Sequence, residues 1–170
     1  MTQLEHESGL EPKRESLYYK TIEGARRVFK TPFEGKSDEF VSKYLFNSEK
    51  MANYVYANRM GNGNEASGDG FRFRAGGFIG VTGRANFLVM SKDTRIDFIN
   101  DPDIINTEAN ALISALWYWQ KANLNKHADN DDLEAISDII NIGRQTKAQG
   151  DSNGFKHRKE LYGKYKKLVY

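Results

Sequence analysis

The 170-residue chain has no cysteine, only three histidines and only three prolines. Without cysteine there can be no disulfide, no thiolate metal site and no cysteine nucleophile. Two of the histidines, His127 and His157, are far apart in the sequence and show no spacing typical of metal ligands. We therefore expect packing alone to stabilise the fold, and we expect neither a metal nor a cofactor.

Long apolar runs and an excess of one charge are missing as well. No apolar run approaches the ~20 residues that span a bilayer, so stable membrane insertion is not expected. The 25 Lys and Arg residues nearly balance the 23 Asp and Glu residues, and the net charge of +2 is too small to predict nucleic-acid binding. Residues 1–14 hold three glutamates instead of a basic start and an apolar stretch, so we expect synthesis in the cytoplasm without a secretory signal.

Basic residues gather near the end of the chain, from Lys156 to Lys167. A charged stretch of this kind usually forms the solvated face of a helix, and this is the interpretation we prefer. The alternative is attraction to an anionic polymer such as a cell wall.

Apolar residues recur at helical intervals over much of the chain. The predicted helices are Ile22–Phe29, Ser37–Tyr56, Asn106–Asn123, Asp132–Ile140 and Gly154–Leu168. Ser37 fits an N-cap. The third helix is apolar on more than one face, which predicts a buried central helix with Trp117 and Trp119 in the core. A chain of this length is expected to form a single domain, residues 1–170.

Glycines crowd the range Gly61–Gly83, together with several aromatic residues. Glycine permits close approach of backbone segments and positive φ. The run Phe71–Arg74 alternates aromatic and arginine residues, which is the period of a strand. We expect loops and short strand pieces that line a groove, and hence a mainly α class with a small β element.

Two carboxylates, Glu7 and Glu15, stand close in the sequence with Glu11 between them. Hydrolysis of a glycosidic bond uses such a pair, one group as the acid and one as base or nucleophile. On one continuous helix residues eight apart would be separated by ~12 Å along the axis, more than the ~6.5–9.5 Å of an inverting pair. Gly9 and Pro12 make a continuous helix unexpected, so the chain can turn between the two glutamates.

The motif His6–Gly9, which reads His-Glu-Ser-Gly, is followed by Glu15–Tyr19, which reads Glu-Ser-Leu-Tyr-Tyr. A longer block, Phe71–Phe87, reads Phe-Arg-Phe-Arg-Ala-Gly-Gly-Phe-Ile-Gly-Val-Thr-Gly-Arg-Ala-Asn-Phe. Ser114–Trp119 and Ile140–Gly143 follow in order. On these motifs the chain resembles the endolysins and chitinases of glycoside hydrolase family 19, from His6 almost to the C-terminus.

The resemblance implies a lysozyme-like α+β fold with a substrate cleft, and an inverting hydrolase. It makes Glu7 the general acid, Glu15 the second carboxylate, with Glu11 in reserve, and Thr82 the residue that holds the attacking water. His6 is expected to pack beside Glu7, with orientation of Glu7 as the alternative. The substrate-binding residues that it implies are Tyr19, Arg74, Phe78, Ile79, Asn86 and Asn141.

The chain departs from the family pattern at Ala75, Gly76 and Gly80, where a glycine, an arginine and a glutamine are usual. Gly80 removes a polar contact with substrate that the glutamine ordinarily makes. The family also has an N-terminal helical portion before the His-Glu motif, of which only residues 1–5 are present here.

The leading functional hypothesis is therefore a monomeric peptidoglycan hydrolase, an endolysin-like muramidase that cleaves between N-acetylmuramic acid and N-acetylglucosamine. It would act on the bacterial cell wall, in the periplasm, after another factor releases it. One alternative is a chitinase that acts on N-acetylglucosamine polymers. Another is a glycan-binding relative without turnover.

Overall fold

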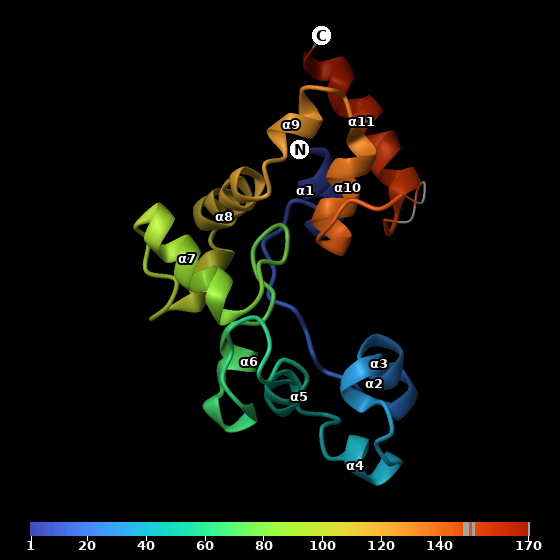
Figure 1. Cartoon of the computed structure of the whole chain (residues 1–170), viewed down its shortest axis with the longest axis vertical. Helices are drawn as coiled ribbons and strands as arrows, with labels where there is room; N and C mark the ends of the chain where they lie inside the picture. Colours follow the sequence, from blue (N-terminus) through green and yellow to red (C-terminus); the bar gives the residue numbers. More distant parts are fainter. Residues whose placement is uncertain (148–149, 151, 170) are drawn as a thin grey trace. The chain divides into compact units, whose positions relative to one another are not determined.

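A computed structural model of the protein describes residues 1–147, 150 and 152–169. These residues form the α-helices α1 to α11 and the short 3-10 helices η1 (Glu65–Ser67) and η2 (Pro102–Asn106), as Figure 1 shows. Within the same residues the only β pairing is one antiparallel bridge between Gly76 and Val81. The prediction of a mainly α, lysozyme-like class with a small β element is confirmed.

The chain is divided into two compact units. Unit 1 contains Met1–Lys13, Gly77–Gly80 and the chain from Ile105 onward, and unit 2 contains Arg14–Gly76 and Val81–Ile104. Each unit is described by itself below. The single catalytic domain expected from the sequence stays a prediction.

Unit 2 opens with four helices, α2 (Ile22–Val28), α3 (Lys30–Phe33), α4 (Asp38–Ser42) and α5 (Ser48–Val55). They enclose an apolar core to which all four contribute: Leu17, Ala25, Phe29, Phe33, Val41, Met51, Ala52 and Val55. Ser37 caps α4 as predicted, because its hydroxyl accepts a hydrogen bond from the Phe40 amide at 3.2 Å.

The prediction of one helix over Ser37–Tyr56 was wrong, since α4 and α5 are separate. Phe46 between them has a φ of 57°, in the left-handed region, which a right-handed helix cannot contain. The Phe46 amide instead donates to the Tyr19 carbonyl at 2.9 Å. The Asn47 side chain then caps a new helix by accepting from the Lys50 amide at 2.9 Å.

The remaining helices of unit 2 are α6 (Asp69–Arg72) and α7 (Arg84–Thr94). The strand period seen in Phe71–Arg74 was misleading, because the first two of these residues belong to α6. Gly70 explains this local fold: a Cβ there would lie 2.3 Å from the Ala52 carbonyl oxygen. This close packing on α5 gives the Phe71 amide the Asn53 side-chain oxygen as acceptor, at 2.7 Å, in place of a neighbouring strand.

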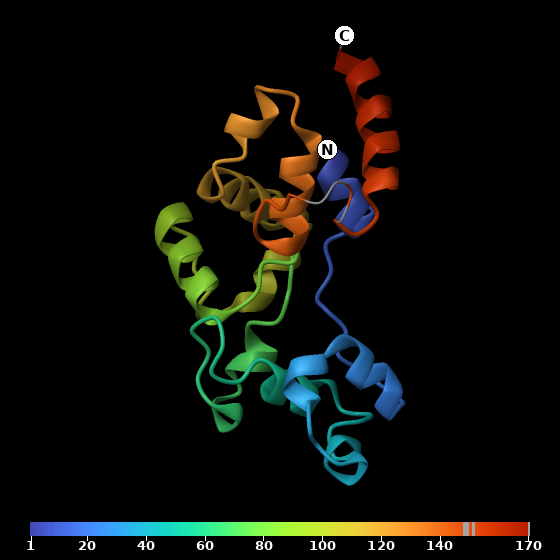
Figure 2. The same cartoon turned by 45° about the vertical axis from the view of Figure 1, so that its right-hand side comes forward.

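Unit 1 contains α1 (Thr2–Ser8), α8 (Glu108–Lys121), α9 (Asn125–Ala128), α10 (Leu133–Ile142) and α11 (Phe155–Val169). Figure 2 shows α1 alongside α10 and α11. The Asp132 side chain caps α10 by accepting from the Ala135 amide at 3.0 Å. The predicted helices at Asp132–Ile140 and Gly154–Leu168 are thus present with slightly different ends.

The sequence predicted a buried central helix that is apolar on more than one face, whereas helix α8 is buried on one face only. Trp117 is buried as expected, whereas Trp119 is half-buried. Leu112 and Leu116 are 44% and 56% exposed. They are exposed because they line an open apolar cavity of about 510 Å³ in unit 1, to which Ile79 also contributes.

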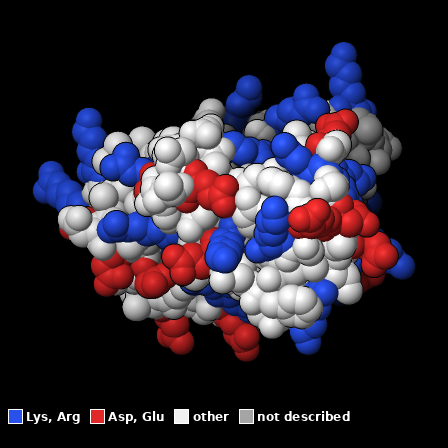
Figure 3. Space-filling view, turned by 90° about the horizontal axis from the view of Figure 1, so that it is seen from below, with Lys and Arg blue, Asp and Glu red and all other residues white. Residues whose placement is uncertain are grey.

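The surface charge is mixed. On the face shown in Figure 3, Lys and Arg side chains are interspersed with Asp, Glu and uncharged residues. In the basic stretch of α11, Lys164 pairs with Glu5 at 3.1 Å and Lys166 with Asp131 at 2.5 Å. No helix of the described residues is long and apolar enough to cross a bilayer.

Candidate active site

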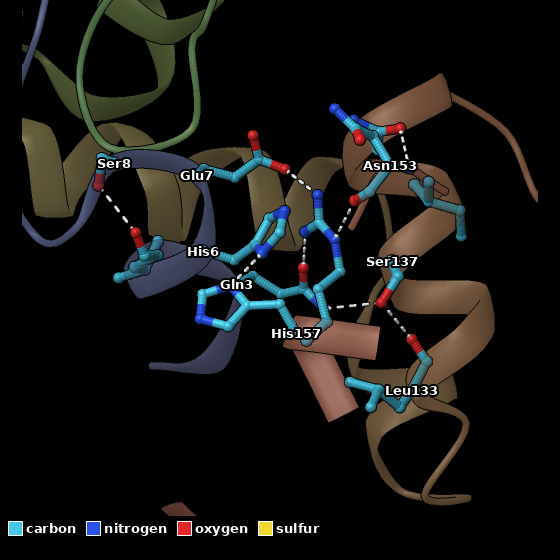
Figure 4. A network of polar contacts seen from close by, with 12 residues as sticks. Gln3, His6, Glu7, Ser8, Leu133, Ser137, Asn153 and His157 are labelled. Atoms are coloured by element: carbon cyan, nitrogen blue, oxygen red, sulfur yellow. Dashed lines mark hydrogen bonds and ion pairs between the residues drawn. The ribbon is translucent and has the colours of Figure 1, made fainter. Parts of the chain in front are cut away.

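Glu7 is on the last turn of α1 and is 24% exposed at its side chain. Helix α1 ends at Ser8 because Gly9 takes the left-handed conformation, with φ of 66°. The prediction that no continuous helix joins Glu7 to Glu15 is therefore confirmed. The Glu7 Oε1 atom accepts a hydrogen bond from an Arg158 guanidinium nitrogen at 2.5 Å (Figure 4).

Arg158 is the centre of the network around Glu7. Its side chain is completely buried, which for an arginine requires polar partners on all sides. Besides Glu7 it donates to the Gln3 side-chain oxygen and to the Asn153 carbonyl, the latter at 3.1 Å. Gln3 in turn donates to the Ser137 hydroxyl of α10 at 3.0 Å. The carboxylate of Glu7 is thus fixed by residues from α1, α10 and α11 (Figure 4).

Beside Glu7, the Nδ1 atoms of His6 and His157 are 2.9 Å apart. A contact of this length needs a proton on one ring nitrogen and none on the other. Burial, with Arg158 next, lowers the pKa of His6. His6 therefore packs beside Glu7 as expected, but its pairing with His157 was not predicted, because 151 residues separate the two in sequence.

In unit 2, Glu15 lies in the segment before α2 and is half-buried. The Tyr56 hydroxyl donates to its two carboxylate oxygens at 3.0 and 2.8 Å. The Glu15 amide donates to the Ala75 carbonyl at 2.9 Å, which fixes the backbone. Burial raises the pKa of Glu15, and the Tyr56 hydrogen bond opposes this rise.

Glu11, the reserve candidate, has a different environment. Its side chain is 81% exposed and its contact with Lys13 is long, at 3.9 Å. An exposed pair of this kind is held weakly. Of the two candidates for the second carboxylate, only Glu15 is held in orientation by hydrogen bonds, which come from the half-buried Tyr56.

Thr82 follows the bridge between Gly76 and Val81 and is half-buried. Asn86, on the first turn of α7, donates its side-chain amide to the Thr82 carbonyl at 2.8 Å. The bridge and this hydrogen bond together fix the backbone on both sides of Thr82.

Arg74 makes several contacts within unit 2. It donates to the Phe71 carbonyl at 2.8 Å, lies 4.0 Å over the Phe71 ring and is 4.0 Å from Asp103. Arg14 lies beside it, and burial together with the Arg74 charge lowers the pKa of Arg14 to about 10. These contacts give Arg74 a structural role besides the substrate contact that the resemblance implies.

The other predicted binding residues occupy different environments. Tyr19 is half-buried, with its ring edge-on to Phe29 at 5.6 Å. Phe78 and Ile79 are half-buried in unit 1. Asn141 is exposed at the end of α10, where its side-chain oxygen accepts from the Asn153 amide at 2.9 Å.

The predicted site residues therefore form two groups, each of which is organised locally. Unit 1 contains Glu7, Phe78, Ile79 and Asn141, and unit 2 contains Glu15, Tyr19, Arg74, Thr82 and Asn86. In the part of the chain that the structure describes, no group of three or more His, Asp or Glu residues could hold a metal ion.

Sequence analysis assigned no role to Arg158 or Tyr56, although each contacts a predicted catalytic carboxylate. Arg158 falls within the part of the chain over which the resemblance runs, from His6 almost to the C-terminus, but no quoted motif contains it. Nothing in the local pattern distinguishes Tyr56 from Tyr54 of α5, which packs against the core.

Comparisons with known proteins give evidence about the family of the chain. No family model matches the chain. The chain is 32% identical over 166 residues to a protein of Haemophilus influenzae named "Glycosyl hydrolase family 19 domain-containing protein". The match covers 95% of this chain and 74% of that protein.

Proposed function

Since the chain belongs to glycoside hydrolase family 19, we propose that it hydrolyses the bond between N-acetylmuramic acid and N-acetylglucosamine in peptidoglycan, with inversion. The observation that carries the proposal is the fixed carboxylate of Glu7. Burying an arginine costs free energy unless charged or polar partners compensate for the water that it loses. Here it holds a carboxylate that stays partly open to solvent.

Glu7 is the proposed general acid. Arg158 engages Oε1, and we assign the transferable proton to Oε2. In the reaction Glu7 gives this proton to the glycosidic oxygen as the bond to the sugar breaks, and Arg158 then stabilises the carboxylate that forms. The short helix α1 can supply the acid because its side chains are tied to α10 and α11.

Glu15 is the proposed general base, with Thr82 holding the water. In an inverting reaction the base removes a proton from water on the opposite face of the sugar. A base with a raised pKa accepts that proton more readily, and burial raises the pKa of Glu15. Tyr56 keeps the carboxylate in one orientation through its two contacts.

Peptidoglycan is the preferred substrate, and the protein would act as a monomer in the periplasm, released there by another factor. Chitin is the alternative, since it presents the same N-acetyl sugars without the peptide. The exposed lysines of α11 favour the anionic wall. Glu5 and Asp131 neutralise two of the basic residues of that helix, however, so the preference rests on few charges.

The test compares the wild type with Glu7→Gln and Glu11→Gln on purified peptidoglycan and on a chitin oligomer. Reducing sugar is measured, and products are identified by mass. We expect release from peptidoglycan by the wild type and by Glu11→Gln, and a loss of at least about 100-fold in Glu7→Gln, the scale of a lost acid.

Glu11→Gln is the matched control, because it removes an exposed carboxylate of the same segment. Equal rates for the wild type and Glu7→Gln would remove Glu7 from the acid role. Release from chitin alone would replace the muramidase by a chitinase. Binding of either polymer without release would favour the glycan-binding alternative.

A further inference from the structure

Two aromatic rings of unit 2, those of Tyr18 and Phe46, are exposed to solvent. Tyr18 is 49% and Phe46 59% exposed, whereas Leu17 is completely buried. The Tyr18 and Phe46 rings contact each other with centroids 6.2 Å apart and planes at 75°. The two rings therefore form an aromatic corner, by which we mean Tyr18 and Phe46 together.

The backbone conformation of Phe46 is energetically unfavourable. Its φ of 57° is in the left-handed region, which is unfavourable for a residue with a Cβ. The hydrogen bond from the Phe46 amide to the Tyr19 carbonyl joins this position to the segment that carries Tyr18. Glycine or asparagine would fit this φ better, so a phenylalanine that stays 59% exposed here indicates a use for its ring.

The aromatic corner is close to Glu15. Two residues, Ser16 and Leu17, lie between Glu15 and Tyr18, so the Cα atoms of Glu15 and Tyr18 are at most about 11 Å apart. Glu15 also raises the pKa of Tyr19, after burial, so the residue that follows Tyr18 in the chain lies near the carboxylate. A polysaccharide chain that reaches Glu15 can therefore reach the corner.

We propose that Tyr18 and Phe46 form a sugar-binding subsite for the N-acetylated polysaccharide, on the Glu15 side of the reaction. This inference rests on the proposed function. A pyranose ring presents C–H groups on its face, and these fit the negative face of an aromatic ring. Because the two rings stand at 75°, a sugar stacked on one meets the edge of the other.

The test measures binding without turnover. All variants carry Glu7→Gln, and co-sedimentation with insoluble peptidoglycan gives the dissociation constant. Tyr18→Ala and Phe46→Ala are each expected to weaken binding roughly fivefold to tenfold, the scale of one aromatic contact. Leu88→Ala is the matched control, since Leu88 is 53% exposed on α7 of the same unit, and it should bind as the parent does.

Phe46→Gly separates binding from folding. Glycine accepts the positive φ, so this variant should unfold at the same or a higher temperature than the parent while binding as weakly as Phe46→Ala. Loss of binding together with a lower unfolding temperature in Phe46→Gly would give Phe46 a structural role and overturn the proposal.

Other outcomes also decide. Equal binding by the parent, Tyr18→Ala and Phe46→Ala would overturn the subsite and leave the hydrolase proposal intact. A wild type that releases no sugar, with binding that depends on Tyr18 and Phe46, would support the subsite and refute hydrolysis. A change of oligomeric state on gel filtration, with unchanged binding, would make the corner a protein contact and overturn the proposal.

Discussion

Replacing Arg158 by methionine should lower the stability of the protein more than replacing an exposed charged residue does. Methionine keeps an unbranched apolar stem in the buried space and removes the guanidinium. The change deletes hydrogen bonds to Glu7, Gln3 and the Asn153 carbonyl. It leaves the Gln3 side chain, which is 5% exposed, without this donor.

The magnitude follows from these contacts. All three hydrogen bonds have the charged guanidinium as donor, and a hydrogen bond of this kind contributes about 1.5–3 kcal/mol. Removing one partner of a buried pair costs about 3–5 kcal/mol when the other stays buried. Glu7 is 24% exposed and can regain water, so we expect a loss of about 3 kcal/mol. For a chain of this size the midpoint should fall by about 6–12 °C.

Thermal unfolding followed by circular dichroism measures this shift. Lys164→Met is the matched control, since it removes one cation of α11 from a pair in which Lys164 is 56% exposed, and its shift should be far smaller. Glu7→Gln keeps an acceptor for Arg158, and combined with Arg158→Met it should cost less than the sum of the two changes. A midpoint for Arg158→Met no lower than that of Lys164→Met would refute the reasoning.

Two predictions concern pH. Tyr56→Phe removes the donor that favours ionised Glu15, so the pKa of Glu15 should rise further and the acidic limb of kcat/KM should move to higher pH; an unmoved limb would contradict Glu15 as the base. The lowered pKa of His6 means that the unfolded chain binds its proton more tightly, so stability should fall as pH drops below 6.5, the ordinary value. Urea unfolding from about pH 7.5 to about pH 5 checks this second prediction, and the pH dependence should be weaker in His6→Gln than in the wild type.

Local rules explain what the sequence predicted well. Ser37 caps a helix because its hydroxyl can reach the amide three residues ahead, a contact that needs no other part of the chain. Gly9 ends α1 because glycine tolerates the left-handed conformation. The candidate residues in the His-Glu motif and in the Phe71–Phe87 block were assigned through the resemblance to the family. That resemblance implies which residues lie at the substrate site, whereas their spacing along the chain does not.

Contacts between distant segments explain the failures. No residue next to Phe46 predicts a left-handed conformation there, because the hydrogen bond that stabilises it is donated by the Phe46 amide to the distant Tyr19 carbonyl. The strand period of Phe71–Arg74 was misleading because Gly70 brings this segment against the Ala52 carbonyl, where a helical turn fits. Leu112 and Leu116 of α8 were misjudged because an apolar pattern does not tell a core from the wall of an open cavity.

Helix α1, which carries the proposed acid Glu7, is not explained by local helix rules alone. Seven residues are too few for a helix that is stable by itself. Three of its side-chain contacts are Gln3 to Ser137, Glu7 to Arg158 and Glu5 to Lys164, and their partners belong to α10 or α11 near the other end of the chain. The His-Glu motif therefore indicates the proposed acid, Glu7, while Arg158 of α11 holds its carboxylate. A change in α11 should alter catalysis through Arg158 even where it contacts no substrate.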